Sequence, residues 1–287
     1  RSTDHGKTWT DMERIVDFPN GLSASDPSMI VDRVSGEIFL FYNYMDLEKE
    51  QDIYYLHVIK SGDNGLTWSD PEDITRQIAK AEWHKDFKFI TSGRGIQTST
   101  GKLLHCMVNL DHGMHLFASD DHGASWHLID TPIKPANESK VVELADGRWM
   151  VNSRVNGGKK RWVHISSDQG QSWESRPEPA LIDPACNGSI IRYTSVKGGS
   201  DKNRLLFSNA KQKKGTTNLT VRISYDEGES WSEGKCIYPG GSAYSSLTIL
   251  ANGDFGLVFE KDYYTENPFV SFSLEWLTDG LDEFKKP

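Results

Sequence analysis

Short apolar runs separated by glycine-containing turns recur along the whole chain. Residues 28–32 and 37–42 form two such runs, and the Arg-Val-Ser-Gly segment between them is typical of a hairpin turn. The order of strand, turn, strand and loop returns downstream, for example over 101–109 and 114–118. No long stretch shows the 3.6-residue period of an amphipathic helix. The pattern predicts an all-β chain of many short strands, with one helical turn near 275–284.

A short motif, Ser-x-Asp-x-Gly-x-(Ser/Thr)-Trp, closes five of these units. Its first serines are Ser2, Ser61, Ser119, Ser166 and Ser224, so consecutive copies stand between 47 and 59 residues apart. Spacing of this regularity indicates a repeat architecture. The motif predicts a tight turn in which the Asp carboxylate accepts hydrogen bonds from amides one or two residues on and the Gly supplies a positive φ. The closing Trp is expected to pack under the turn with its indole N–H able to find a partner.

Composition and charge narrow the classes of protein that the chain can represent. The 287 residues are 37% hydrophobic and 25% charged, which is ordinary for a soluble globular protein, and we expect one domain over 1–287. The net charge of −9 disfavours nucleic acid and acidic membrane surfaces as partners. No apolar run approaches the ~18 residues of a membrane span. The three cysteines, far apart in sequence, suggest neither a disulfide framework nor a zinc site.

Four histidines gather around the third copy of the motif, at His112, His115, His122 and His127. They straddle a turn and have no ordered carboxylate partner in the sequence, so they are interpreted as surface histidines rather than metal ligands. We therefore expect neither a metal nor a cofactor.

The repeated motif is the Asp-box, and the chain resembles the bacterial-type exo-α-sialidases (neuraminidases). The resemblance implies a six-bladed β-propeller in which each box caps a turn between the third and fourth strands of a blade, on the rim and away from the active site. Because Arg1 already lies inside the first box, it also implies that the first blade is incomplete. The family favours a secreted or periplasmic protein, although the start of this chain leaves localisation open.

Several segments beyond the boxes resemble the sialidase active site. By this resemblance Glu138, in Asn-Glu-Ser-Lys, is the general base, and Arg154, at the end of Asn-Ser-Arg, is one of three arginines that grip the substrate carboxylate. Tyr244, in Gly-Ser-Ala-Tyr-Ser, is the nucleophile. Asn187 would line the pocket, and Glu260 would support the nucleophile or an arginine on the substrate-binding side. Taken singly each residue is unremarkable, and their order between the boxes carries the assignment.

These residue types fit an acidic sugar. Sialic acid carries a carboxylate on its anomeric carbon, so a carboxylate nucleophile would approach a like charge at short range. A neutral tyrosine avoids this repulsion, and its unperturbed pKa of ~10 requires a base such as Glu138 to take the proton. Arginine suits the carboxylate because its planar fork binds two oxygens and keeps its charge.

Two elements of the sialidase pattern have no counterpart in the chain. The acid/base Asp and the first arginine precede the first box in the family, and neither Asp4 nor Asp26 substitutes for that Asp. The position of the third arginine holds Thr216, with Lys213 or Lys214, or the more distant Arg222, as other sources of charge. We therefore expect the 287-residue chain alone to hydrolyse sialosides very weakly or not at all.

Two other functions stay open at this point. The chain could be a non-enzymatic Asp-box propeller that binds glycans or proteins, which Thr216 favours and the set of Glu138, Arg154 and Tyr244 opposes. It could also be a trans-sialidase or a glycosidase for a different acidic sugar. The expected partner of the preferred reading is a sialylated glycan, with the oligomeric state undetermined.

Overall fold

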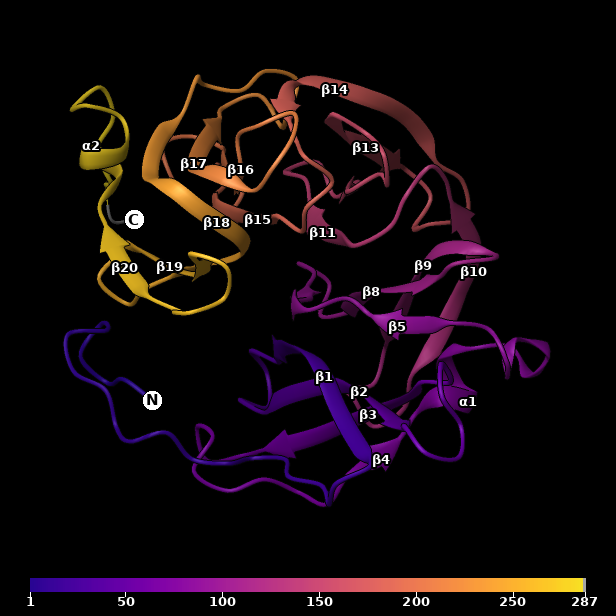
Figure 1. The fold of residues 1–287 in the computed structure, drawn as a ribbon. Helices are drawn as coiled ribbons and strands as arrows, with labels where there is room; N and C mark the ends of the chain where they lie inside the picture. Colours follow the sequence, from indigo (N-terminus) through magenta and orange to yellow (C-terminus); the bar gives the residue numbers. More distant parts are fainter. Residues whose placement is uncertain (286–287) are drawn as a thin grey trace.

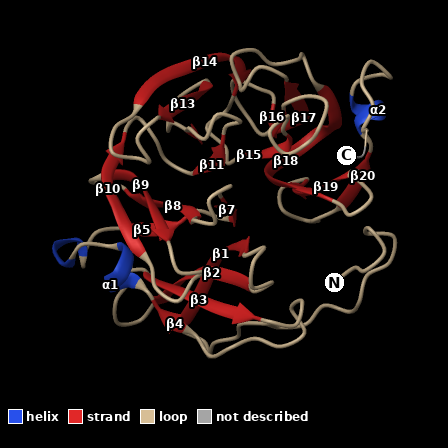
Figure 2. Ribbon diagram, turned by 180° about the vertical axis from the view of Figure 1, so that it is seen from behind, coloured by secondary structure: helices blue, strands red, loops and turns tan. Residues whose placement is uncertain are grey.

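The computed structural model describes residues 1–285, and its sheets stand around a common centre as the blades of a propeller (Figure 1). Seen from behind, the ring is closed by strands on all sides except beside the N-terminal segment (Figure 2). Helix is confined to three single turns: α1 (Thr75–Ile78), η1 (Ala81–Trp83) and α2 (Leu274–Leu277). The expected all-β propeller is confirmed, and so is the helical turn near the C-terminus.

The first two sheets are antiparallel ladders whose inner edges meet. The first has the order β4-β3-β2-β1-β6, with the short β6 parallel to β1, and the second has the order β10-β9-β8-β5, with β7 also on β8. Their bounds are β1 (Leu22–Val31), β2 (Ile38–Asp46), β3 (Tyr55–Ser61), β4 (Glu72–Asp73), β5 (Lys88–Ile90), β6 (Gly93–Arg94), β7 (Ile96–Gln97), β8 (Leu103–Asn109), β9 (Gly113–Ser119) and β10 (His127–Ile133).

The third sheet has four strands in sequence order, and the fourth has six. Their bounds are β11 (Ser139–Glu143), β12 (Trp149–Ser153), β13 (Lys160–Ser166), β14 (Glu174–Ile182), β15 (Ser189–Thr194), β16 (Arg204–Ala210), β17 (Thr217–Ser224), β18 (Lys235–Ile249), β19 (Phe255–Lys261) and β20 (Phe269–Phe272). The basic segment 211–216, between β16 and β17, is a loop.

The described residues form four hydrogen-bonded sheets, whereas six blades were expected. One reason is β18, whose 15 residues pair first with β17 and then with β19, so that two ladders share one strand. The other is the first repeat, because residues 1–21 contain no strand. That repeat packs on the last ladder instead: Trp9 lies edge-on to Phe269, with ring centroids 5.2 Å apart.

Apolar side chains fill the space between neighbouring sheets. Every residue of β8, β9 and β16 is buried, as expected for strands covered on both faces. Between the first two sheets Phe39, Phe41, Phe117 and Trp126 contact one another edge-on. This packing fixes the sheets relative to one another and leaves the inner strands around the centre. A cavity of about 700 Å³ lies there, lined by β1, β6, β11, β15 and β18.

The Asp-boxes show where the sequence prediction needs correction. In the second box the Asp63 carboxylate accepts hydrogen bonds from the Leu66 amide at 3.0 Å and from the amide and the hydroxyl of Thr67 at 2.9 and 2.6 Å. Its partners therefore lie three and four residues on rather than one or two. The preceding Ser61 hydroxyl accepts from the Gly65 amide at 2.8 Å. Gly65 has the expected positive φ of 77°, and Asn64 before it has one of 60°. The box therefore needs two consecutive left-handed residues.

The expectation for the box tryptophans was wrong in four of five cases. Only the Trp9 indole nitrogen donates a hydrogen bond, to the Gly6 carbonyl at 3.1 Å. The indole nitrogens of the other four are buried without a hydrogen-bond partner: Trp68, Trp126, Trp173 and Trp231. These rings stabilise the turns by apolar contact, which for an aromatic ring outweighs one unmade hydrogen bond.

Candidate active site

The register of one hairpin brings Glu138 and Arg154 together. Ser139 of β11 pairs with Ser153 of β12, so the next pair outward is Glu138 and Arg154. The backbone confirms this pairing, because the Arg154 amide donates to the Glu138 carbonyl at 3.0 Å. Directly opposed residues of an antiparallel pair have neighbouring side chains. The Arg154 Nη1 atom accordingly forms an ion pair with Glu138 Oε2.

Tyr244 reaches the same carboxylate from β18, in a different sheet. Its hydroxyl donates to Glu138 Oε2 at 2.7 Å, and Arg154 Nη1 donates to the Tyr244 oxygen at 3.2 Å. The Tyr244 amide donates to Glu260 Oε2 on the adjacent β19, at 3.0 Å. Four of the five residues that the sequence singled out are therefore in one hydrogen-bonded cluster.

The cluster is largely shielded from water. Glu138 is 3% exposed, and the side chain of Arg154 is 23% exposed. Burial raises the pKa of Tyr244 well above its usual range, and the Glu138 charge and hydrogen bond raise it further, against the opposing charge of Arg154. Burial lowers the pKa of Arg154, but the charges and hydrogen bonds of Glu138 and Tyr244 together outweigh burial and leave that pKa raised. The resting site holds a neutral phenol that donates to Glu138 beside a permanent cation.

Asn187, the fifth residue, lies one step away from this cluster. It precedes β15, is 3% exposed, and accepts a hydrogen bond from Lys140 Nζ at 2.7 Å. Its amide nitrogen donates to the Ser92 hydroxyl at 3.0 Å. Within the described residues its hydrogen bonds go to these two side chains.

The structure places two further ionisable groups at the centre: Asp26, which sequence reasoning considered and set aside, and Lys140, which it did not single out. Asp26 stands at a bulge of β1 between Ser25 and Ser28, with a left-handed φ of 54°. A bulge redirects a side chain, and here burial and the charge of Glu138 raise the pKa of Asp26. The sequence signal was a Ser-Asp-Pro that interrupts the strand. Lys140 could also have been found, because residues two apart on a strand point to the same face and Lys140 is two residues after Glu138.

Comparison with known proteins supports the assignment of the family and of the fold. A family model for the BNR repeat-like domain matches residues 1–257. The chain belongs to this family. Its sequence is 34% identical to a sialidase of Micromonospora viridifaciens, over 96% of this chain and 46% of that protein. A sialidase of Bacteroides fragilis is 30% identical, over 91% of this chain and 53% of the relative.

Solved structures show the same architecture for this BNR-repeat chain. The Hadza microbial sialidase Hz136 superposes with a TM-score of 0.84 at 27% identity, over 96% of this chain and 59% of that one. An intramolecular trans-sialidase from Ruminococcus gnavus, at 19% identity and a TM-score of 0.79, shares the fold. The chain spans about half the length of the two bacterial relatives in sequence.

The extra cations that the sequence offered do not reach Tyr244. Thr216 uses its carbonyl to accept from the Ser242 amide at 2.7 Å. Lys213 and Lys214 are exposed on the loop, and Arg222 is buried, donating to Asn209 at 2.9 Å. Over residues 1–285, Arg154 is the one guanidinium that hydrogen-bonds Tyr244 or Glu138.

The histidine prediction needs two corrections. Three of the four rings do lie beside a carboxylate: His112 beside Asp86 at 3.4 Å, His122 beside Asp32 at 2.9 Å and His127 beside Asp120 at 3.6 Å. His112, His122 and His127 are exposed to about half, but His115 is buried at 1%, with its ring against Trp83 at 4.9 Å. Burial lowers the pKa of His115. It faces the core because its strand, β9, is covered on both faces. Within the part of the chain that the structure describes, no group of three or more His, Cys, Asp or Glu is placed to hold a metal, and no helix is long and apolar enough to cross a membrane.

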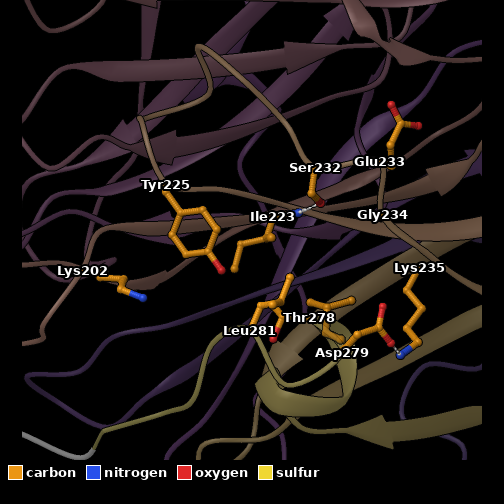
Figure 3. A pocket seen from close by; sticks show the side chains of 11 residues that line it. Lys202, Ile223, Tyr225, Ser232, Glu233, Gly234, Lys235, Thr278, Asp279 and Leu281 are labelled. Carbon is orange, nitrogen blue, oxygen red and sulfur yellow. Dashed lines mark hydrogen bonds and ion pairs between the residues drawn. The ribbon is translucent and has the colours of Figure 1, made fainter.

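A second cavity, of about 640 Å³, lies beside α2 and shares no residue with the Tyr244 cluster (Figure 3). Tyr225 and Leu281 face it, and Lys235 pairs with Asp279 at its edge, at 2.5 Å. The Tyr225 hydroxyl donates to Asp282 Oδ2 at 2.9 Å, but Arg204 and Lys202 also pair with that carboxylate. Burial raises the pKa of Asp282, yet these two cations hold it below its usual range, which makes Asp282 a weak base for the phenol.

Proposed function

We propose that this chain carries the centre of an exo-α-sialidase that removes terminal sialic acid from glycoconjugates with retention of configuration. The observation that supports this most is the contact of Tyr244 with Glu138 and Arg154. A phenol, its base and a cation for an anionic substrate are what this reaction needs at one point. The relatives named sialidases support the same reading, and we propose that residues 1–287 fold as one domain around the site.

In this mechanism the Tyr244 oxygen attacks the anomeric carbon while Glu138 Oε2 takes the phenol proton. The bond from that carbon to the leaving oxygen breaks, and a general acid, which we assign to none of the described residues, protonates the oxygen. Water then attacks the anomeric carbon from the face that the leaving group vacated, opposite Tyr244, and gives its proton to the conjugate base of the general acid. The bond between that carbon and the Tyr244 oxygen breaks, Glu138 returns the proton to the phenol, and the two inversions give net retention. The resting hydrogen bond of 2.7 Å already aligns the proton for its transfer to Glu138.

Arg154 is proposed to bind the substrate carboxylate. Its Nε donates to Asn156, and its Nη1 serves Glu138 and Tyr244, whereas its Nη2 has no hydrogen-bond partner among residues 1–285. The free edge of the guanidinium can therefore meet a carboxylate oxygen without breaking the contacts that position Tyr244. Asn187 lines the binding site and is held by Lys140 and Ser92. Glu260 holds the backbone of Tyr244 by accepting a hydrogen bond from its amide.

A non-catalytic glycan-binding propeller is the second candidate. The single arginine at the cluster and the threonine at position 216 favour it, because a carboxylate held by one guanidinium binds less tightly than one held by three. Such a protein would bind a sialylated glycan and release it unchanged.

Binding and turnover measured on the same protein distinguish the two candidates. We expect an unsaturated sialic acid analogue to bind the wild type, and Arg154→Ala to lose about 10- to 150-fold in affinity, as ~1.5–3 kcal/mol per charged hydrogen bond implies. Arg148→Ala is the matched control, since Arg148 is an exposed arginine of the same hairpin that pairs with Asp146.

Turnover is followed by NMR of the sugar released from a sialoside. First release of the α-anomer by wild type, and none by Tyr244→Phe, supports the enzyme, and we expect the rate of the 287-residue chain to be very low. Release of the sugar by the wild type, however slow, would contradict the second candidate. Unchanged affinity in Arg154→Ala would contradict the site itself.

A further inference from the structure

Lys140 is a buried cation without a direct counterion. It lies two residues after Glu138 on β11, is 2% exposed, and forms no ion pair within 4.0 Å in residues 1–285. Its ammonium donates to Asn187 Oδ1 at 2.7 Å and to the Ser139 carbonyl at 3.4 Å. Burying a charge is costly unless it is paired. A lysine in this position needs a reason, because a methionine of similar length would fill the same space without that cost.

The hydrogen bonds of Lys140 join three sheets across the centre. Lys140 belongs to β11, Asn187 precedes β15, and Ser92 stands between β5 and β6. An ammonium only donates, so the Asn187 oxygen must face Lys140 and its NH2 group must face Ser92. The amide of Asn187 is thereby fixed, and the hydrogen left on its nitrogen makes it a donor toward any ligand above it.

The charges around Lys140 come from every element packed against it. Glu138 lies on its own hairpin, Asp26 on β1 and Arg161 on β13, where Arg161 is paired with Asp183 at 3.2 Å. On β8, burial raises the pKa of the Cys106 thiol to about 12 and lowers the pKa of His105 to about 3, so both are neutral at pH 7.

The remaining charges nearly cancel. Glu138 and Asp26 are balanced by Arg154 and Lys140, since the Arg161 charge is already matched by Asp183. Glu260, behind the Tyr244 amide, adds one further carboxylate. An acidic sugar adds one more negative charge to this group. Without Lys140 that sugar would have to enter a site that already carried net negative charge.

We propose that Lys140 is a positioning residue that fixes the Asn187 amide as a hydrogen-bond donor and balances the buried carboxylates so that an anionic sugar can bind. The choice of ligand rests on the proposed function. The inference explains how a site with one contacting arginine can accept a carboxylate in a chain of net charge −9. It also gives Asn187 a defined role, because the hydrogen bond from Lys140 fixes which end of the Asn187 amide faces the ligand.

The proposal predicts that the affinity for an anionic ligand depends on pH. Burial lowers the pKa of Lys140 to about 8, with the Glu138 charge acting in the opposite direction. The ammonium is therefore charged at neutral pH and loses its proton as pH rises through about 8. Affinity for an anionic ligand should fall over the same range, and by linkage a bound anion should raise the pKa of Lys140.

The first test needs no ligand. In the free protein the ¹³Cε signal of Lys140, identified by its absence in Lys140→Met, should titrate near pH 8, below the ~10.4 of exposed lysines. Asn187→Asp should move this titration upward, because a carboxylate would then face the ammonium. A Lys140 signal that titrates with the exposed lysines, or is unmoved in Asn187→Asp, overturns the positioning role.

The second test measures binding of the unsaturated sialic acid analogue from pH 6 to 9.5 by calorimetry. Lys140→Met should bind about ten-fold more weakly than wild type at pH 7 and should lack the fall in affinity near pH 8. Lys88→Met is the matched control, because Lys88 is also buried, at 1%, but donates to the His84 carbonyl away from Tyr244.

The outcomes separate the two proposals. Wild-type affinity in Lys140→Met, or weaker affinity with an unchanged pH profile, overturns the role for Lys140 even if the site is a sialidase. Absence of analogue binding by wild type at every pH refutes the proposed function, and with it the ligand half of this inference. The titration of the free protein still decides the positioning half.

Discussion

The hydroxyl of Tyr244 donates to Glu138 Oε2 at 2.7 Å, although 106 residues separate the two in the chain. One comes from a hairpin of the third sheet and the other from the strand shared by the last two ladders. The propeller brings both to its centre, and Arg154 contacts each of them.

Replacing Glu138 should change the acidity of Tyr244. In Glu138→Gln the charge that raises the pKa of Tyr244 is gone while Arg154 stays, so that pKa should fall. Alkaline titration of tyrosine absorbance, with Tyr244→Phe subtracted to isolate the signal, measures it. An unchanged Tyr244 titration would mean that the carboxylate does not act on the phenol.

Removing the Tyr244 hydroxyl should separate chemistry from binding. Any turnover of a fluorogenic sialoside should fall about 10³-fold or more in Tyr244→Phe, whereas affinity for the analogue should stay within about three-fold. Tyr238→Phe is the control, because Tyr238 is on the same strand but hydrogen-bonds Asp262. Turnover retained in Tyr244→Phe would rule out the tyrosine nucleophile.

The Asp-boxes should make the protein sensitive to acid. Hydrogen bonds from Thr67, Ser125 and Ser172 lower the pKa values of Asp63, Asp121 and Asp168 to about 2. A carboxyl group whose folded pKa is depressed stabilises the fold above its unfolded value of ~3.9, and this stability is lost as pH falls toward the folded value.

Urea unfolding between pH 5 and pH 2 tests this expectation. The unfolding midpoint should fall with pH in the wild type and should fall less steeply in Asp168→Asn, which has no carboxylate in its box to protonate. Parallel slopes for the two proteins would show that the box carboxylates do not cause the acid sensitivity.

Gly123 should tolerate a methyl group far less than Gly147. Both have positive φ, 82° and 93°, but a Cβ at Gly123 would lie 2.2 Å from the Phe39 ring, whereas one at Gly147 would meet nothing within 4 Å. Alanine at Gly147 should cost about 1–2 kcal/mol of unfolding free energy from backbone strain alone. At Gly123 overpacking adds about 1–3 kcal/mol, and equal costs in denaturant unfolding would contradict this account.

Much of the fold was predictable because its signals are local. The serine–aspartate–glycine turn and the alternation of apolar residues act over a few positions, so five boxes and most strands could be read directly. The partner of the box aspartate was misjudged, because two consecutive left-handed residues carry the chain back toward it. The burial of His115 was missed since strand periodicity does not reveal whether one face or both are covered.

The candidate site divides in the same way. The resemblance to sialidases pointed to Glu138, Arg154, Tyr244, Asn187 and Glu260, and the register of one hairpin then accounts for the Glu138–Arg154 contact. Asp26 was considered and set aside, and Lys140 was not singled out. A bulge brings Asp26 to the centre and the meeting of three sheets brings Lys140 there, and neither feature is visible in residue order.

The amino-acid sequence by itself determined the repeats, the strands and the types of side chain available for chemistry, because these depend on neighbours within a few residues. Only the tertiary structure decided which charges meet at the centre and which are buried there. Ionisation and hydrogen bonding depend on distance and on exclusion of water, and both arise when strands far apart in the chain converge on one axis.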